Sequence, residues 1–211
     1  MPLTTRLLWC LLALLVPLTA HAGGCHAPDS RIKSGIVKIE GDSIAGSGVV
    51  IAPGLVLTAA HVIEGVDDID VVVQRRAREA RVVSRDRRID LALLAVDTRD
   101  IKPLPLRNRP LSEQSTVWAL GYAFGKRLKS GRGRFRTEAN RLIYTSAPVN
   151  FGQSGGGLLS CENGRLVLTG IIRAFGAEKK NGKLVRRDDI SVATRPDDTR
   201  QFISTASLFT N

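Results

Sequence analysis

GVVIAPGLVLTAAHVI, residues 48–63, contains two short β-rich runs on either side of a Pro53-Gly54 turn and then continues into a histidine. Short runs bounded by Gly, Pro and Asp are typical of strands. Runs of the same kind recur outward along the chain, at residues 35–39, 70–73, 80–83 and 91–96. We therefore expect an all-β barrel or sandwich here, with a single helical turn at residues 59–63 that carries His61.

A second set of short strands follows a linker with several prolines at residues 102–110. Asn181-Gly182 is a strong hairpin turn, and it predicts a protruding ribbon over residues 177–188. The acidic residues Asp197 and Asp198 are typical of a helix N-terminus. We therefore expect a C-terminal helix that packs against the second set of strands. The expected strands of this set cover residues 116–120, 142–145, 157–159, 166–172, 184–185 and 190–193.

The first residues indicate the compartment. Arg6 precedes an apolar run at residues 7–18, and residues 20–22 (AHA) have the small-x-small pattern of a signal-peptidase site. The run is shorter than the about 20 apolar residues of a membrane span. We expect residues 1–22 to be a signal peptide cleaved near Ala22, and the mature chain to be exported without stable membrane insertion. The alternative is an uncleaved N-terminal anchor.

Removal of residues 1–22 also removes Cys10 and leaves Cys25 and Cys161. Two cysteines in an oxidising compartment permit one disulfide, which would tie the new N-terminal arm to the turn at residues 161–164. Sequence alone does not show that the two sulfurs meet. The competing interpretation is a lipidated Cys25, although the leucine usual three residues before such a cysteine is absent.

The formal net charge is +11, which bears on partners and solubility rather than on fold. We interpret the basic clusters at residues 75–78 and 85–88 as solvated faces. Residues 126–136 are expected to form a Gly-interrupted basic loop that could contact an anionic envelope component such as lipopolysaccharide. No aromatic-studded basic motif of the RNA- or single-strand-binding type occurs, so nucleic acid is not an expected partner.

Three short boxes carry the chemistry: residues 57–62 (LTAAHV), 89–94 (IDLALL) and 152–157 (GQSGGG). A serine hydroxyl is a weak nucleophile near neutral pH and needs an imidazole to take its proton. The imidazole needs a carboxylate on its other nitrogen to fix its tautomer. His61, Asp90 and Ser154 fit these three roles. Each box alone also fits a packed histidine, a surface salt bridge or an ordinary turn, but their order and spacing favour catalysis.

In these boxes the chain resembles the trypsin-like serine proteases, and among them the bacterial HtrA (high-temperature-requirement) group. Residues 58–61 match the histidine box of the family, residues 90–94 its aspartate box and residues 154–156 its serine box. Residues 118–125 (WALGYAFG) look like the segment that opens the second barrel in the HtrA group. The resemblance extends over residues 35–195 without a large gap.

The resemblance implies an all-β fold of two six-stranded antiparallel β-barrels with a short C-terminal helix. Residues 23–110 would form the N-terminal barrel, which carries His61 and Asp90. Residues 111–211 would form the C-terminal barrel, which carries Ser154, together with the helix. The active site would lie in the crevice between the barrels. We expect no peptide-binding PDZ domain of the kind that many HtrA proteases carry.

By the same resemblance, the backbone N–H groups of Gly152 and Ser154 would form the oxyanion hole, with Gln153 between them. The expected reaction is acyl transfer, in which Ser154 attacks a peptide carbonyl and His61 moves the proton. It needs no cofactor and no metal. A serine in a glycine-rich turn also occurs in α/β-hydrolases, but there the serine precedes the acid and the histidine. Here the order is His61, Asp90, Ser154.

The wall of the primary substrate pocket is expected from Pro148 and Asn150 before the serine turn, and from Arg173 and Phe175 on a later strand. No acidic residue stands at its base, so a preference for Lys or Arg is not expected. Pro148 and Phe175 favour a short apolar pocket for small aliphatic side chains. Arg173 stands where the family usually has Ser or Thr. We expect its side chain to point outward or to line the substrate groove, since an inward orientation would pair it with Asp90.

The sequence thus predicts an exported serine endopeptidase that acts on polypeptide substrates. The alternative is a catalytically silent protein of the protease fold that binds peptides or polyanions. The intact set of His61, Asp90 and Ser154 argues against the silent protein, and Arg173 is the feature in its favour.

Overall fold

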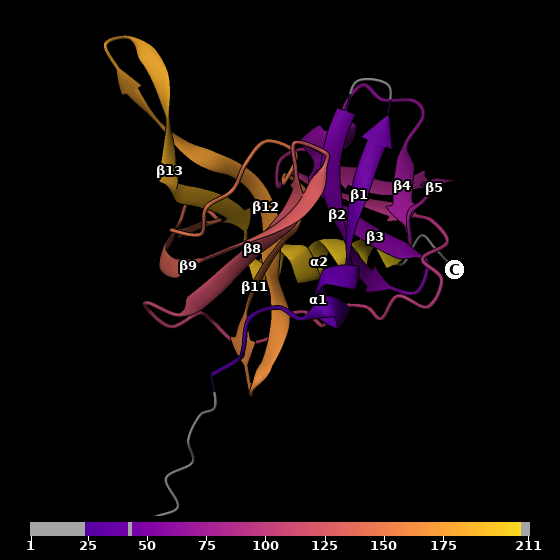
Figure 1. Ribbon diagram of the computed structural model, residues 1–211, viewed down its shortest axis with the longest axis horizontal. Coiled ribbons are helices and arrows are strands. Elements are labelled where there is room, and N and C mark those ends of the chain that lie inside the picture. Colours follow the sequence, from indigo (N-terminus) through magenta and orange to yellow (C-terminus); the bar gives the residue numbers. More distant parts are fainter. Residues whose placement is uncertain (1–23, 42–43, 208–211) are drawn as a thin grey trace, which may run out of the picture.

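The computed structural model describes residues 24–41 and 44–207, and the expected signal peptide at residues 1–22 lies outside them. The chain forms two β-rich units side by side, and helix α2 (Pro196–Ser207) lies across them (Figure 1). The expected all-β class is therefore confirmed.

The first unit is an antiparallel sheet with the strand order β5-β4-β1-β2-β3-β7-β6. The short helix α1 (Ser30–Ser34) precedes it, and the single 3-10 turn η1 (Ala60–Ile63) carries His61, as the sequence predicts. The strands are β1 (Ile36–Gly41), β2 (Ile44–Ala52), β3 (Leu55–Thr58), β4 (Asp70–Val73), β5 (Arg76–Glu79), β6 (Arg81–Asp86) and β7 (Leu91–Ala95).

This sheet has seven strands instead of the expected six because β5 and β6 are the two halves of one bent strand. The two edge strands, β5 and β6, are separated by a single residue, Ala80. The Ala80 N–H donates to the carbonyl of Ile69 at 2.8 Å. One intervening residue spans only about 7 Å of chain, so the opposite edges of the sheet meet at Ala80. Strands β5 and β6 thus act as one bent strand, and the sheet curls as the expected six-stranded barrel does.

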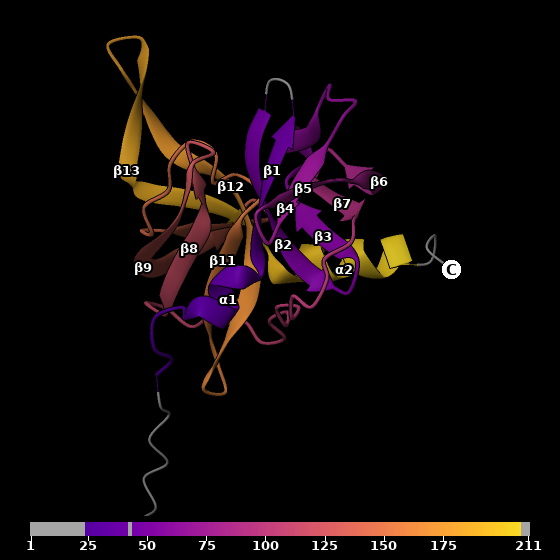
Figure 2. The same ribbon diagram turned by 45° about the vertical axis from the view of Figure 1, so that its right-hand side comes forward.

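The second unit is a closed barrel of six strands in the order β10-β13-β12-β11-β8-β9, as expected. The return ribbon of β12 and β13 turns at Asn181 and Gly182, which both have positive φ, at 49° and 78°. Figures 1 and 2 show this ribbon extending away from the barrel, which confirms the predicted protrusion. The strands are β8 (Thr116–Ala123), β9 (Arg127–Ala139), β10 (Leu142–Thr145), β11 (Gly157–Glu162), β12 (Arg165–Lys180) and β13 (Lys183–Thr194).

Strand β9 corrects the prediction of a basic loop at residues 126–136. It pairs with β8 from Thr116↔Arg134 to Ala123↔Arg127. Its glycines allow close packing and do not mark a loop. A Cβ on Gly131 would lie 2.3 Å from the Pro148 carbonyl oxygen, and one on Gly133 would lie 2.1 Å from the backbone nitrogen of Ala147. The glycines therefore let the segment before the serine turn cross the strand closely.

Apolar side chains on both faces of β8 join the two units. Val117 and Ala119 belong to the core of the second barrel. Trp118 and Leu120 belong to the larger cluster of buried residues that includes the core of the first unit. This alternation is the period of a strand. Fully burying a side chain such as Leu120 stabilises the fold by about 1.5–3 kcal/mol. The units are thus held by a continuous apolar contact, which fixes the cleft between them.

Helix α2 packs more widely than expected. The sequence predicts a helix against the second barrel, but Phe202 and Ala206 are buried in the core that includes the first unit, and the helix contacts both β7 and β12. The reason is that its apolar face spans the seam between the units. None of the helices in the described part of the chain is long and apolar enough to cross a membrane.

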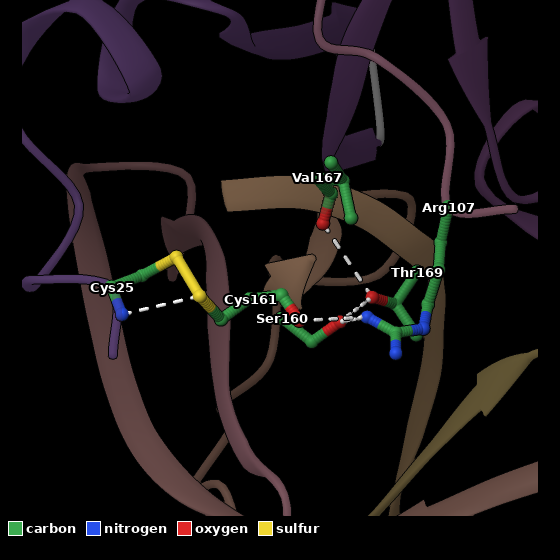
Figure 3. The surroundings of a disulfide bond; sticks show 6 residues. All are labelled: Cys25, Arg107, Ser160, Cys161, Val167 and Thr169. Atoms are coloured by element: carbon green, nitrogen blue, oxygen red, sulfur yellow. Dashed lines mark hydrogen bonds between the residues drawn. A yellow bond between two sulfur atoms is a disulfide. The ribbon is translucent and has the colours of Figure 1, made fainter. Parts of the chain in front are cut away.

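Cys25 and Cys161 form a disulfide, with their Cα atoms 5.5 Å apart (Figure 3). Of the two interpretations left open by the sequence, the structure supports this one, because a thioether-lipidated Cys25 has no thiol for such a bond. The bond ties the N-terminal arm to β11, across 136 residues of sequence.

The linker between the units is held on the same strand by Arg107, which is buried (Figure 3). Its Nη1 donates to the Ser160 hydroxyl at 2.8 Å and to the Cys161 carbonyl at 3.0 Å. Its Nε and Nη2 donate to the carbonyls of Arg109 and Pro110. Burial lowers the pKa of Arg107 from its ordinary value. These bonds satisfy a buried charge and fix the path of the linker.

Candidate active site

The imidazole of His61 contacts the carboxylate of Asp90. Its Nδ1 lies 2.9 Å from Oδ2 and 3.0 Å from Oδ1, and the His61 backbone N–H donates to Oδ1 at 3.0 Å. Strand β3 and the turn η1 carry the histidine, while the turn before β7 carries the aspartate. Because an ionised carboxylate only accepts hydrogen bonds, Nδ1 carries the proton and Nε2 of the neutral ring is left as the basic nitrogen.

Asp90 is buried, with 6% of its surface exposed, and its φ of +58° lies in the left-handed region that aspartate tolerates better than most residues. Burial raises the pKa of Asp90, but the hydrogen bonds from His61 and Arg173 outweigh it, so the pKa lies below the usual value of an aspartate. The carboxylate therefore stays ionised and acts as a fixed acceptor for His61.

The outward orientation expected for Arg173 is wrong, whereas the alternative, a position in the substrate groove, agrees with its place in the wall of the cleft that holds His61 and Ser154. Arg173 Nε donates to Asp90 Oδ2 at 2.9 Å, so its side chain turns inward. The β12–β13 pairing shifts register between Ile172 and Ala174, which places Arg173 at a β-bulge. A bulge re-aims a side chain relative to regular alternation. This orientation gives the buried carboxylate of Asp90 a cationic partner. Without it, the neutral imidazole of His61 would be its side-chain partner.

Ser154 lies in a tight turn next to the histidine. Its hydroxyl donates to the backbone carbonyl of Arg173 at 3.1 Å, rather than to His61. Gly152 and Gly155 flank it with φ of +82° and +81°. A Cβ on Gly155 would lie 2.1 Å from the Ser47 carbonyl oxygen, so only glycine fits there.

Ser47 and Thr58 anchor the serine turn to the first unit, and sequence reasoning missed both roles. The Ser47 hydroxyl donates to the Gly152 carbonyl at 2.8 Å, and its N–H donates to the Ser154 carbonyl at 2.9 Å. The Thr58 hydroxyl donates to the Ser47 carbonyl at 2.7 Å. Thr58 belongs to the histidine box, but the box does not reveal its bond to Ser47, and the signal at Ser47 is only the pair of glycines beside it.

Two backbone N–H groups in the turn are open to a ligand. Among the described residues, the N–H groups of Gly152 and Ser154 have no acceptor. Their neighbours are satisfied: the Gln153 N–H donates to Asn150 at 3.1 Å and the Gly155 N–H to Ile172 at 2.8 Å. A developing oxyanion requires N–H donors that are not already paired, so these two groups are available for that role.

A cleft of about 400 Å³ brings His61 and Ser154 together. Of the four predicted wall residues, Asn150, Arg173 and Phe175 line this cleft, but Pro148 does not. Pro148 is exposed and packs beside Gly131 instead, because the segment before the serine turn crosses β9 there. The other lining residues are mostly apolar or small: Ile44, Ala45, Val62, Val149, Phe151, Gly152, Ile172 and Ala174.

Sequence reasoning missed the wall residue Phe151 and also the role of Arg186, which packs behind three other wall residues. The guanidinium of Arg186 lies 4.7 Å from the centroid of the Phe175 ring, and its Nη2 donates to the Val149 carbonyl at 2.5 Å and to Asn150 Oδ1 at 2.9 Å. The rings of Phe151 and Phe175 meet edge to face at 5.0 Å. The register Ala177↔Arg186 brings this arginine back from the ribbon, which no local pattern could reveal.

The described residues contain no group of three or more His, Cys, Asp or Glu side chains arranged to hold a metal ion. The cleft is lined by the Ser154 hydroxyl and the His61 imidazole, and the carboxylate of Asp90 contacts that imidazole from behind the cleft wall. Such a set can move a proton from a hydroxyl to an imidazole and stabilise the resulting cation.

Comparison with known families fixes the class. The chain belongs to the trypsin-like peptidase domain family, whose profile matches residues 46–167, a range that includes His61, Asp90 and Ser154. Within that class it is similar to HtrA-type proteases, as the resemblance in the three boxes implies.

Among curated proteins, the chain is 35% identical over 150 residues to the serine protease Rv3671c of Mycobacterium tuberculosis, a match that covers 64% of this chain and 36% of that protein. It is 32% identical over 143 residues to a probable periplasmic serine endoprotease, DegP-like, of Pseudomonas fluorescens, covering 63% of this chain and 30% of that protein. The chain spans about a third of the length of these curated relatives.

Among solved structures, the HtrA-type protease AlgW with a tripeptide is similar with a TM-score of 0.73 and 25% identity, over 83% of this chain and 61% of that chain. The serine endoprotease from Yersinia pestis is similar with a TM-score of 0.70 and 25% identity, over 86% of this chain and 68% of that chain. The fold expected from the sequence is thereby confirmed.

Proposed function

We propose that the chain is an exported serine endopeptidase in which Ser154 is the nucleophile, His61 the general base and Asp90 the orienting carboxylate. The observation that carries the proposal is the 2.9 Å contact between His61 Nδ1 and the buried Asp90, with Ser154 in the same cleft. This contact leaves Nε2 free to take the serine proton.

The reaction begins with a rotation of the Ser154 side chain from the Arg173 carbonyl toward His61 Nε2. Loose catalytic hydrogen bonds are common in unliganded enzymes and tighten when substrate binds. Ser154 Oγ then bonds to the peptide carbonyl carbon while Nε2 takes its proton. The N–H groups of Gly152 and Ser154 stabilise the oxyanion. The C–N bond breaks as His61 returns the proton to the leaving amine, and water releases the acyl group by the same steps.

The proposed cleavage site follows small aliphatic residues of a polypeptide substrate. Val149, Ile172 and Ala174 give the cleft apolar walls, and no carboxylate lines it among the described residues. Arg186 stacks on the ring of Phe175, which is itself a lining residue. A peptide library cleaved by the chain tests this preference, and cleavage after Lys or Arg would contradict it.

Export is proposed from the N-terminal pattern at residues 1–22. Two observations support it: the Cys25–Cys161 disulfide suits an oxidising compartment, and curated relatives are named periplasmic. Fractionation of cells that express the chain, with N-terminal sequencing of the mature form, tests it. The expected mature chain begins just after Ala22.

A silent protein of the same fold is the second candidate. The bond from the Ser154 hydroxyl to the Arg173 carbonyl favours it, because this bond occupies the nucleophile in the observed state. A related proposal is contact with an anionic envelope component through β9, where Arg132, Arg134 and Arg136 are exposed. Neutralising these arginines should then abolish binding to lipopolysaccharide while peptidase activity is kept.

Labelling with a fluorophosphonate probe separates an enzyme from a silent protein. The parent chain is expected to be labelled, and Ser154→Ala is not. Ser204→Ala, which changes an exposed serine on α2, is the matched control and keeps the label. A parent chain that folds but is never labelled would sink the enzymatic proposal.

A further inference from the structure

Asp90 has two side-chain partners, His61 and Arg173. Its Oδ2 accepts from His61 Nδ1 and from Arg173 Nε, each at 2.9 Å. The Asp90 side chain is 8% exposed and the Arg173 side chain 27% exposed. One nearly buried carboxylate is therefore shared between an imidazole and a guanidinium.

The other charged groups around this set are already paired with each other. Glu64, which follows η1, pairs with Arg87 at 2.9 Å, and Arg88 pairs with Asp86 at 3.0 Å. These four side chains are largely exposed, apart from Asp86, so solvent screens their effect on the cleft. Strands β3 and β7 add no charged residue next to His61 and Asp90. Within the described residues, Arg173 is thus the cation that acts directly on the carboxylate.

A shared carboxylate stabilises a protonated imidazole less than an unshared one. When His61 takes a proton, the negative charge opposite it is already balanced by the guanidinium. Two cations then face one carboxylate, and like charges disfavour the charged form of each other. Arg173 should therefore oppose protonation of His61 in the resting protein, while it holds Asp90 in place for the Nδ1 bond.

We propose that Arg173 is a positioning residue that shares Asp90 with His61 and thereby extends the activity of the enzyme to lower pH than the His61–Asp90 pair alone would allow. The inference rests on the proposed peptidase function. It assigns to Arg173 a role at the carboxylate instead of the role in substrate binding that the sequence suggests. The substrate does not need to touch its side chain.

The test uses the full chain and three variants. Arg173→Gln keeps a hydrogen-bond donor and removes the charge, Arg173→Lys keeps the charge, and Arg76→Gln removes a charge from exposed β5 as the matched control. For Arg173→Gln, we expect the acidic limb of kcat/KM to move to higher pH by about one unit, the size of shift produced by a charge within about 6 Å. Arg173→Lys and Arg76→Gln should keep the limb near its original position.

A fall in kcat/KM by the same factor at every pH in folded Arg173→Gln would overturn the proposal, because it would reduce Arg173 to a packing role. If Arg173→Gln does not fold, Arg173→Ser replaces it with the same expectation, since its hydroxyl is uncharged. Circular dichroism identifies the folded variants.

Failure of the inference and failure of the proposed function can be told apart by NMR. The titration of the His61 ring is followed in Ser154→Ala and in Ser154→Ala/Arg173→Gln, neither of which needs to be active. A titration midpoint that rises by about one pH unit in the double variant supports the role of Arg173 even if the chain is no peptidase. An unchanged midpoint overturns that role even if the fluorophosphonate label is found.

Discussion

The hydroxyl of Ser47 donates a 2.8 Å hydrogen bond to the carbonyl of Gly152, which lies 105 residues away in the sequence. The same hydroxyl accepts from the Tyr122 N–H at 2.8 Å. Ser47 is completely buried, and it thus joins β2, β8 and the serine turn at one point. The candidate catalytic groups come from two separate β units. The hydrogen bonds of Ser47 therefore help to fix the position of the serine turn relative to His61 and Asp90.

Ser47→Ala should weaken both stability and activity. The change leaves the Gly152 carbonyl and the Tyr122 N–H without their partner, and each buried unsatisfied group costs about 1–3 kcal/mol. We expect a lower free energy of unfolding in urea and a fall in kcat. Ser204→Ala is the exposed control and should change neither quantity. Unaltered unfolding of Ser47→Ala would show that the joint does not hold the turn.

Gly155→Ala should be far more harmful than Gly164→Ala. Both glycines have positive φ, +81° and +75°, so both variants carry the same backbone penalty, about 1–2 kcal/mol. At Gly155 the new Cβ would also lie 2.1 Å from the Ser47 carbonyl oxygen and 2.2 Å from Thr58 Oγ1, whereas at Gly164 nothing lies within 4 Å. Thermal unfolding and kcat/KM of the two variants measure the difference. Equal losses would contradict the packing described for the turn.

Removal of the Cys25–Cys161 bond should lower stability through the unfolded state. The bond closes a loop of 136 residues, and disulfides of natural domains stabilise by about 2–4 kcal/mol. The double variant Cys25→Ser/Cys161→Ser is expected to unfold at a lower urea concentration, and a reducing agent should shift the parent chain by the same amount and the variant not at all. A parent chain indifferent to reduction would argue that the arm is held by other contacts.

The stability advantage of Asp90 over asparagine should depend on pH. The folded pKa of Asp90 is held below the ordinary value, because the bonds from His61 and Arg173 outweigh burial. Its contribution is therefore fully present above the unfolded pKa of about 3.9 and is lost as the pH falls through the lower, folded pKa. Urea unfolding of the parent chain and Asp90→Asn at neutral and acidic pH should show the gap closing on acidification. A gap that widens in acid would contradict the pairing.

Local sequence patterns were enough to predict the strands that hold the candidate site. The histidine turn, the apolar run of β7 and the Asn181-Gly182 ribbon each follow from residues that are neighbours in the chain. The three boxes likewise fixed His61, Asp90 and Ser154 as candidates, since their chemistry is tied to residue type and order.

What the sequence could not show depends on contacts between distant segments. The inward turn of Arg173 results from a bulge opposite β13. The glycines of β9 were misread because their close contacts are with residues 147 and 148, which lie beside them only in the folded chain. The roles of Ser47 and Arg186 depend on bonds to the segment at residues 149–154, which no periodicity marks. The strand propensity of a segment predicts that a strand forms, but the pairing register of that strand determines which way its side chains point.

The most direct test of the proposed active site is peptide mapping of the chain after reaction with diisopropyl fluorophosphate. The account predicts one adduct, on the peptide that contains Ser154, formed rapidly in the parent chain and very slowly in His61→Ala. An adduct elsewhere, or one that forms on Ser154 equally fast without His61, would show that these residues do not work as a nucleophile and its base.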